Sequence, residues 1–232
     1  MRRYDFVLLD ADNTLFDFDA AERKALRSVL EDRGYTADRA TVETYTKINA
    51  ELWAAFARGE AEQDFILVER FRRFQAAVGG DHDPGQFNAD YQKALSANAD
   101  LIPGALELCR SLSAGGCTLA IVTNGAAVAQ RGRYAASPIR EYVRHLFISQ
   151  ELGVGKPDPL FFDHVCRKMG ICDRGRAVVA GDSLASDILG GNRAGIDTVW
   201  YNPCGIPLTG PARPTWTAAN LSEIEAVIFG TL

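Results

Sequence analysis

The 232-residue sequence predicts an α/β fold built on a doubly wound parallel sheet, with an all-helical domain inserted after the first strand. Two observations lead to this expectation. Short, uninterrupted apolar runs alternate with helical stretches, and such runs are typical of strands buried on both faces of a parallel sheet. Residues 19–98, in contrast, contain no strand-like run. We therefore expect residues 1–18 and 99–232 to form an α/β core and residues 19–98 to form a separate helical domain.

Five apolar runs predict the strands of the core, and each ends abruptly in polar or small residues. The runs are Phe6–Leu9, Leu119–Val122, Leu146–Ile148, Ala177–Ala180 and Thr198–Tyr201. Helices are expected over residues 104–112, 159–169 and 187–194, since a glycine follows each stretch as a stop signal. In open α/β sheets, ligands bind beyond the carboxyl ends of the strands. The residues that follow each run are therefore the candidates for chemistry.

Four amphipathic helices are expected in the inserted segment. Apolar residues recur at three- and four-residue steps within residues 21–33, 42–56, 67–78 and 84–95. Asp83 and Pro84 are typical of a helix start, where a capping residue precedes a proline at the first helical position. The aromatic residues of these helices are expected to form the core of the domain, among them Trp53, Phe56, Phe65 and Phe71. Three arginines are expected on a solvated helix face, namely Arg70, Arg72 and Arg73.

Composition and charge exclude several classes of protein. The 25 Lys and Arg are outnumbered by 30 Asp and Glu, giving a formal net charge of −5, so no nucleic-acid partner is expected. No apolar run approaches the roughly 20 residues of a membrane span, and the first residues do not resemble a secretory signal. The 5 cysteines form no C-x-x-C pair, and the 3 histidines show no zinc-ligand spacing. We expect a cytoplasmic protein with reduced thiols and no membrane partner, either a monomer or a homodimer.

Carboxylates follow the first and the fourth predicted strands. Asp10 and Asp12 stand two residues apart, which places both side chains on the same side of an extended chain. Asp182 and Asp187 follow the fourth strand and add further hard oxygen ligands. Carboxylates that lie close together oppose each other's ionisation unless a cation lies between them. The pattern therefore indicates a Mg²⁺ site at the sheet edge, beside a carboxylate that can act as a nucleophile.

Groups suited to phosphoryl oxygens follow other predicted strands. Thr123, Asn124 and Gly125 offer a hydroxyl and backbone amides that can hold an anion. Lys156 lies between a glycine and a proline and supplies a positive charge. Phosphoryl transfer depends mainly on positioning and charge neutralisation, and these groups supply both.

Together, the four groups resemble the haloacid dehalogenase superfamily, whose members carry D-x-D-x-T, then Ser or Thr, then Lys, then an acidic motif. The matching residues are, in order, Asp10–Thr14, Thr123, Lys156, and Asp182 with Asp187. The inserted helices are similar to the type 1 cap of this superfamily, so the resemblance implies a Rossmann-like core with a helical cap at residues 19–98. Further segments look like the YjjG-type pyrimidine 5′-nucleotidases, namely Leu9–Asp19, Gly153–Pro157, Ser186–Gly191 and Pro214–Thr217.

The resemblance implies a role for each motif residue. Asp10 attacks phosphorus and becomes an aspartyl-phosphate, while Asp12 protonates the leaving alkoxide and then activates water. Thr123 and the backbone amide of Asn124 hold phosphate oxygens, and Lys156 bridges Asp10 and the phosphoryl group. The implied protein is a phosphatase that hydrolyses small phosphate esters, with pyrimidine nucleoside monophosphates as the expected substrates.

The resemblance also implies a set of Mg²⁺ ligands. The side chains of Asp10 and Asp182 bind the ion together with the backbone carbonyl of Asp12. Asp187 either orients Lys156 or reaches the metal through water.

Two segments outside the motifs carry further expectations. The loop of residues 58–64, between the second and third inserted helices, matches the specificity loop of type 1 caps, and its Gln63 is a candidate substrate-binding residue. Residues 131–139 lack the glutamine-rich helix that is usual in the nucleotidase group. We expect this stretch to lie away from the motif residues.

Three other functions remain open at the level of the sequence. A 2-haloacid dehalogenase shares the fold and the nucleophile, but usually lacks the acid that Asp12 supplies. A β-phosphoglucomutase-like phosphotransferase also carries D-x-D and is not excluded. A non-catalytic binding protein on this fold tends to lose the nucleophile or the lysine, whereas Asp10 and Lys156 are both present.

Overall fold

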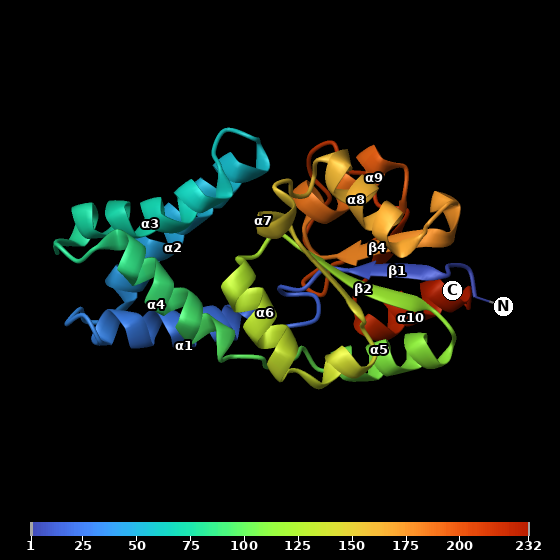
Figure 1. The fold of residues 1–232 in the computed structure, drawn as a ribbon, viewed down its shortest axis with the longest axis horizontal. Coiled ribbons are helices and arrows are strands. Elements are labelled where there is room, and N and C mark those ends of the chain that lie inside the picture. Colours follow the sequence, from blue (N-terminus) through green and yellow to red (C-terminus); the bar gives the residue numbers. More distant parts are fainter. Residues whose placement is uncertain (1, 232) are drawn as a thin grey trace.

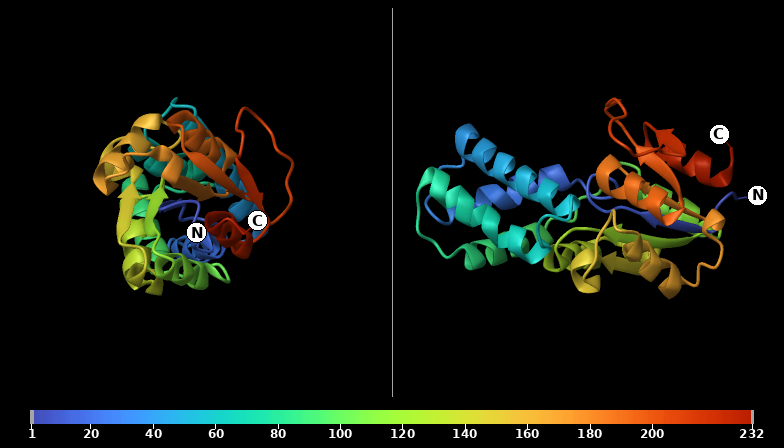
Figure 2. Two further views of the ribbon diagram at one scale, coloured as in Figure 1. Left: turned by 90° about the vertical axis from the view of Figure 1, so that its right-hand side faces the viewer. Right: turned by 90° about the horizontal axis from the view of Figure 1, so that it is seen from above.

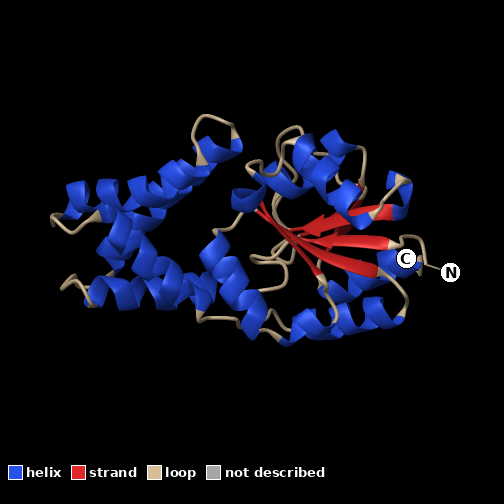
Figure 3. Cartoon of the chain, in the orientation of Figure 1, coloured by secondary structure: helices blue, strands red, loops and turns tan. Residues whose placement is uncertain are grey.

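A six-stranded parallel sheet forms the centre of the core in the computed structural model, which describes residues 2–231 (Figure 1, Figure 3). The strands are β1 (Phe6–Leu9), β2 (Thr118–Thr123), β3 (His145–Ile148), β4 (Ala177–Gly181), β5 (Asp197–Tyr201) and β6 (Trp216–Ala218). Their order across the sheet is β3-β2-β1-β4-β5-β6. The five predicted strands are confirmed. The sixth was not predicted, because three residues are too short to form a recognisable apolar run.

The register of the central strands brings the predicted motifs to one edge. Leu9 at the end of β1 pairs with Ile121 of β2 and Ala180 of β4. Asp10 therefore follows β1 at the level of Gly181, where β4 ends, and of Val122, one residue before Thr123 ends β2. This edge faces the inserted helices (Figure 1).

Helices cover both faces of the sheet, which confirms the doubly wound arrangement (Figure 1). One face packs against α5 (Ala105–Ala114) and α10 (Leu221–Phe229), and the other packs against α8 (Pro159–Met169). Successive side chains of β1 point to opposite faces of the sheet. Val7 and Leu9 pack in the hydrophobic cluster with α5 and α10, and Leu8 packs in the cluster with α8. The remaining core elements are short or lie at the sheet edge: α6 (Ala127–Ala136), α7 (Ser149–Leu152), α9 (Leu189–Ala194), a π-helical turn (Leu184–Ile188), and 3₁₀ turns at Pro138–Glu141 and Arg174–Arg176.

Four helices occupy the inserted segment and form a lobe beyond the carboxyl edge of the sheet (Figure 2). They are α1 (Phe18–Glu31), α2 (Arg39–Ala57), α3 (Gln63–Val78) and α4 (Pro84–Ser96). Three of them begin where an aspartate side chain accepts a hydrogen bond from the first turn, at Asp17, Asp38 and Asp83.

An aromatic cluster holds the inserted helices together, and it is distinct from the two clusters that flank the sheet. Phe71 lies at its centre, stacked on Phe87 with ring centroids 4.3 Å apart and within 5.6 Å of Tyr91. The expected core position of Phe71 is therefore confirmed.

Phe65, in contrast, is 52% exposed, so the expectation for this residue is wrong. Phe65 lies six positions before Phe71, and at about 100° per residue the two side chains point about 120° apart around the helix axis. Phe65 therefore points away from the cluster. The expectation is also wrong for Trp53 and Phe56, which are half-buried and lie outside the cluster.

No helix within residues 2–231 has the length and apolar character needed to cross a membrane.

We expect Phe71→Ala to lower the free energy of unfolding by about 3–5 kcal/mol, the usual cost of truncating a fully buried phenylalanine. Phe65→Ala, on the exposed face of the same helix, is the matched control and should change it by about 0.5 kcal/mol or less. Urea unfolding followed by circular dichroism measures both values. Equal losses in the two variants would contradict the assignment of Phe71 to the centre of the cluster.

Candidate active site

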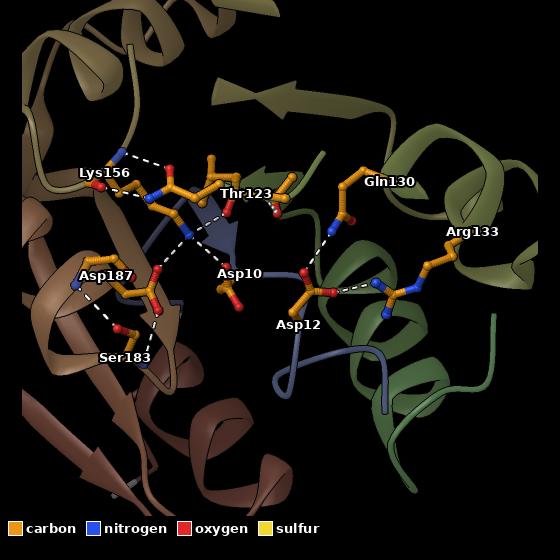
Figure 4. Close-up of polar contacts among 12 residues, drawn as sticks. Asp10, Asp12, Thr123, Gln130, Arg133, Lys156, Ser183 and Asp187 are labelled. Carbon is orange, nitrogen blue, oxygen red and sulfur yellow. Dashed lines mark hydrogen bonds and ion pairs between the residues drawn. The ribbon is translucent and has the colours of Figure 1, made fainter. Parts of the chain in front are cut away.

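Lys156 is the buried centre of the polar groups at the sheet edge (Figure 4). Its Nζ donates to Oδ1 of Asp10 at 2.6 Å, to Oδ1 of Asp187 at 2.6 Å and to the backbone oxygen of Val122 at 2.7 Å. An ammonium group has three N–H donors, so all of them are used. The lysine therefore joins the ends of β1 and β2 to the turn that follows β4.

Burial and charge oppose each other within this group. Burial alone would lower the pKa of Lys156, but the charges of Asp10 and Asp187 outweigh it, so the net shift of the pKa is upward. Burial raises the pKa of Asp10 well above its ordinary value, although the charge of Lys156 opposes that shift. Burial, followed by the charge of Asp187, raises the pKa of Asp182 to about 7. The three carboxylates of Asp10, Asp182 and Asp187 thus outnumber the one ammonium group of Lys156.

The turn after β4 positions the second pair of carboxylates. The hydroxyl of Ser183 accepts a hydrogen bond from the backbone of Ser186 at 3.3 Å and so starts the π-helical turn. Asp187, on that turn, points back toward β4 and accepts from the backbone N–H of Ser183 at 3.1 Å. A Cβ atom at Gly181 would lie 2.3 Å from Oδ2 of Asp187, so only glycine allows this close approach.

The carboxylates fit a divalent cation. Asp10, Asp182 and Asp187 each offer an oxygen atom, and these atoms lie within 4.8 Å of one another. Three carboxylates face one lysine, and burial, together with the charge of the neighbouring carboxylates, raises the pKa of Asp10 and of Asp182. Clustered carboxylate oxygens are the ligands that Mg²⁺ and Ca²⁺ prefer. The donor set therefore suits the expected Mg²⁺.

Thr123 and Asn124 lie beside the lysine, as the sequence predicted. The hydroxyl of Thr123 accepts from the backbone N–H of Gly125 at 2.9 Å, which shapes the loop after β2. The side chain of Asn124 binds both polar groups of the Lys156 backbone: its Nδ2 donates to the carbonyl oxygen at 2.7 Å, and its Oδ1 accepts from the N–H at 2.9 Å. Asn124 therefore fixes the loop that carries the lysine.

Asp12 lies on the opposite side of the site from the lysine (Figure 4). Asn13, with a left-handed φ of 59°, turns the chain directly after it. Oδ2 of Asp12 accepts a hydrogen bond from Nε2 of Gln130 at 2.7 Å, and Oδ1 accepts one from Arg133. Both donors are on α6.

The contact between Arg133 and Asp12 corrects one sequence-based expectation. Residues 131–139 were expected to lie away from the motif residues, and this is wrong for Arg133. Helix α6 begins four residues after β2 and runs beside the Asp12 loop, so one face of it reaches the site. The spacing of Gln130 and Arg133, three residues apart on a helix that follows a motif strand, is the signal that could have identified them.

A cavity of about 400 Å³ opens above these groups. Its floor contains Asp10, Asp12, Thr123, Lys156, Asp182 and Asp187. Its opposite wall comes from the inserted helices and contains Asn49, Trp53, Leu67, Arg70, Tyr91, Gln92 and Leu95. The cavity thus joins the charged edge of the sheet to a mixed apolar and polar wall.

Arg70 belongs to this wall, so the expectation that it lies on a solvated face is wrong. Its side chain is buried, donates to Oδ1 of Asn49 at 3.2 Å and to Oδ1 of Asn88 at 2.8 Å, and lies 4.7 Å from the ring of Tyr91. Arg72 and Arg73 lie on another face of α3, where both pair with Glu69. The three arginines are close in sequence, but a helix distributes them over different directions.

Gln63 makes contacts different from those expected of a substrate-binding residue. It is 7% exposed, and it is not among the residues that line the cavity. Its Nε2 donates to the backbone oxygen of Asn124 at 2.7 Å, and its Oε1 accepts from the hydroxyl of Ser149 at 2.8 Å. Beside it, Gln150 donates to Asp64 at 2.6 Å. These three hydrogen bonds attach the start of α3 to the core.

Comparison with known proteins identifies relatives along almost the whole chain. The family model described as haloacid dehalogenase-like hydrolase matches residues 4–195. The pyrimidine 5′-nucleotidase PynA of Streptococcus pneumoniae is 34% identical over 95% of this chain and 93% of its own length. The pyrimidine 5′-nucleotidase YjjG of Escherichia coli is 31% identical over 97% of this chain and 98% of its own length.

A solved structure matches the complete arrangement of sheet and inserted helices. The HAD-hydrolase YfnB of Bacillus subtilis, crystallised with magnesium, aligns with a TM-score of 0.91 at 32% identity. The alignment covers 98% of this chain and 99% of that chain. The two chains therefore share their fold over essentially their full length.

We expect the stability of the metal-free protein to fall as the pH rises. The pKa of Asp182 is about 7 in the folded state, against an ordinary value of 3.8. Between these pH values the folded protein holds a proton that the unfolded chain has lost, so the free energy of unfolding decreases as the pH rises. The melting temperature in EDTA should therefore drop between about pH 4 and about pH 7, and MgCl₂ should restore it most at the higher pH.

The control for this prediction removes the titrating group. In Asp182→Asn, the melting temperature in EDTA should vary less with pH and respond less to MgCl₂. Asp100→Asn removes an exposed carboxylate that pairs with Lys24, and it should behave as the wild type. Differential scanning fluorimetry provides the measurement. An Asp182→Asn protein that kept the full response to pH and Mg²⁺ would contradict the assignment.

Proposed function

The chain belongs to the haloacid dehalogenase-like hydrolase family, and from this premise we propose that it is a Mg²⁺-dependent phosphatase that hydrolyses pyrimidine nucleoside monophosphates. One observation carries the proposal: the Asp10 carboxylate is held at the floor of the cavity by Lys156, within a cluster of further carboxylates. Nucleophile, cation and phosphate-binding groups then face the same space.

Asp10 is the proposed nucleophile. Lys156 binds its Oδ1, whereas Oδ2 accepts no hydrogen bond from residues 2–231 and is available for attack. Oδ2 forms a bond to phosphorus, the ester P–O bond breaks, and the leaving oxygen takes a proton from Asp12. The products of this step are a free nucleoside and an aspartyl-phosphate at Asp10.

The second half of the reaction restores the enzyme. Asp12, now a carboxylate, takes a proton from water as the water oxygen attacks phosphorus. The bond between Asp10 and phosphorus breaks, and inorganic phosphate leaves. Thr123 and the backbone N–H of Asn124 hold phosphoryl oxygens through both steps. Asp10, Asp182 and the backbone carbonyl of Asp12 would hold Mg²⁺, which would supply positive charge between the carboxylate and the phosphate.

The cavity wall supports a small, partly aromatic leaving group. Trp53, Leu67 and Leu95 offer apolar surface to a flat ring, while Asn49 and Arg70 lie beside them with hydrogen-bonding groups. A cavity of about 400 Å³ suits a soluble monophosphate rather than a polymer. PynA and YjjG, which this chain resembles over its length, are pyrimidine 5′-nucleotidases. We therefore assign the same substrate class here.

We propose different roles for the two parts of the chain. Residues 1–18 and 99–232 form the catalytic core, and residues 19–98 form the cap that selects the leaving group. We place the enzyme in the cytoplasm, since its 5 cysteines are free thiols.

A screen of phosphate esters tests the proposed function. We expect the highest kcat/KM on UMP, dUMP or dTMP, lower values on purine nucleotides, and loss of activity in excess EDTA. Asp10→Asn should lower turnover at least a hundredfold, because an amide does not attack phosphorus, while Asp100→Asn should leave turnover unchanged. Full activity in EDTA would overturn the metal assignment, and release of halide from 2-haloacids would favour a dehalogenase instead.

A second prediction concerns Gln63, whose two hydrogen bonds fasten the α2–α3 loop to the core. Each such bond contributes about 0.5–1.5 kcal/mol, so Gln63→Ala should weaken the attachment of the inserted helices to the core by roughly tenfold and raise KM for every substrate alike. Glu62→Ala, at the exposed neighbouring position, is the control and should have no effect. Steady-state kinetics on UMP and p-nitrophenyl phosphate decide the question, since a loss confined to nucleotides would show that Gln63 reads the base instead.

A further inference from the structure

Arg133 is a buried cation whose only carboxylate partner within residues 2–231 is Asp12. Its side chain is 0% exposed, and its Nη1 donates to Oδ1 of Asp12. The guanidinium lies 4.5 Å from the centre of the Phe16 ring and 5.8 Å from that of Phe18. The two aromatic rings and α6 therefore hold the arginine in place behind the carboxylate.

The arginine is incompletely satisfied by hydrogen bonds. Its Nε and Nη2 find no partner in the described part of the chain. Burying an unpaired donor costs free energy, and burying a charge costs more, so an apolar side chain would suit this position better for stability alone. Local rules of packing are typically broken where function requires it. The one hydrogen bond that the Arg133 side chain donates within residues 2–231, to Asp12, is therefore the interaction that calls for a functional reason.

Gln130 holds the second oxygen of the same carboxylate. It is buried, and its Nε2 donates to Oδ2 of Asp12 at 2.7 Å. The side chain reaches Asp12 across Gly125, where an added Cβ atom would lie 2.1 Å from Nε2 of Gln130. A glycine in the phosphate-binding loop therefore opens the route from α6 to the carboxylate.

Two donors on one helix fix the plane of the Asp12 carboxylate. With Oδ1 bound by Arg133 and Oδ2 bound by Gln130, rotation about the Cβ–Cγ bond breaks at least one hydrogen bond (Figure 4). Arg133 does not line the cavity, so it reaches the reacting groups only through Asp12. Proton transfer depends steeply on the placement of the group that carries the proton.

We propose that Arg133 and Gln130 are positioning residues that orient the Asp12 carboxylate for proton transfer at the leaving oxygen. The inference rests on the proposed function, in which Asp12 is the general acid and base. It assigns a task to α6, a helix of the core that carries no nucleophile, metal ligand or phosphate-binding group of the proposed reaction.

The test compares two leaving groups. A nucleoside leaves as an alkoxide and needs the proton of Asp12, whereas p-nitrophenolate leaves without one. Arg133→Met keeps an unbranched side chain, although a shorter one, and removes its charge. We expect single-turnover phosphorylation by UMP to slow by about 10²-fold in this variant, within the usual range for general acid catalysis. The initial burst of p-nitrophenol should keep its rate, because that step needs no proton.

A double-mutant cycle separates positioning from a structural role. Asp12→Asn removes the group that Arg133 is proposed to orient, so Arg133→Met should add no further loss on UMP in that background. Arg133→Lys should recover part of the wild-type rate. Arg131→Met, on the same helix but exposed and paired with Glu151, is the matched control and should leave both rates unchanged.

The outcomes distinguish the inference from the function on which it rests. A wild type that shows no burst and no turnover on any ester overturns the proposed function, and the inference with it. An active wild type in which Arg133→Met slows both substrates equally, or adds its loss to that of Asp12→Asn, overturns the positioning role alone. Should Arg133→Met fail to fold, Gln130→Leu removes one bond to Asp12 and enters the same cycle, with an expected loss on UMP of about tenfold.

Discussion

The buried ammonium group of Lys156 is the interaction on which the site depends. It connects β1 through Asp10, β2 through the carbonyl of Val122, and the turn after β4 through Asp187. A charge buried to this extent is tolerated only with partners, and removing one partner leaves the others uncompensated. The lysine therefore sets the spacing of the strand ends, and with it the geometry in which nucleophile and acidic cluster face the cavity.

The two aspartates of the first motif have opposite surroundings, although one residue separates them. Asp10 lies among carboxylates and a single lysine, where negative charge is in excess. Asp12 lies between an amide and a guanidinium on α6. Environment of this kind is what gives two chemically identical carboxylates different tasks. Asn13, with its left-handed backbone, turns the chain directly after Asp12.

The sequence predicted the features that depend on local residue patterns and on strand order. Apolar runs predicted five strands, and the shared edge of parallel strands predicted that Asp10, Thr123, Lys156 and Asp182 would meet. The sequence did not predict the side-chain contacts that depend on how the helices pack. Which face of α6 meets the Asp12 loop decides the contact of Arg133, and how the inserted helices sit over the sheet decides the contacts of Arg70 and Gln63. Periodicity identifies a helix but not its neighbour.

The cavity is assembled from two parts that have separate hydrophobic cores. Its charged floor belongs to the sheet, while Asn49, Trp53 and Gln92 on its wall belong to helices that pack around Phe71 and Phe87. Substitutions of these wall residues therefore change neither the strand ends nor the buried members of the aromatic cluster directly. Evolution can therefore change the preferred leaving group through residues of the wall, while the residues of the floor that carry the phosphoryl chemistry stay the same. One reaction can in this way diversify into many enzymes through a segment of about a third of the chain.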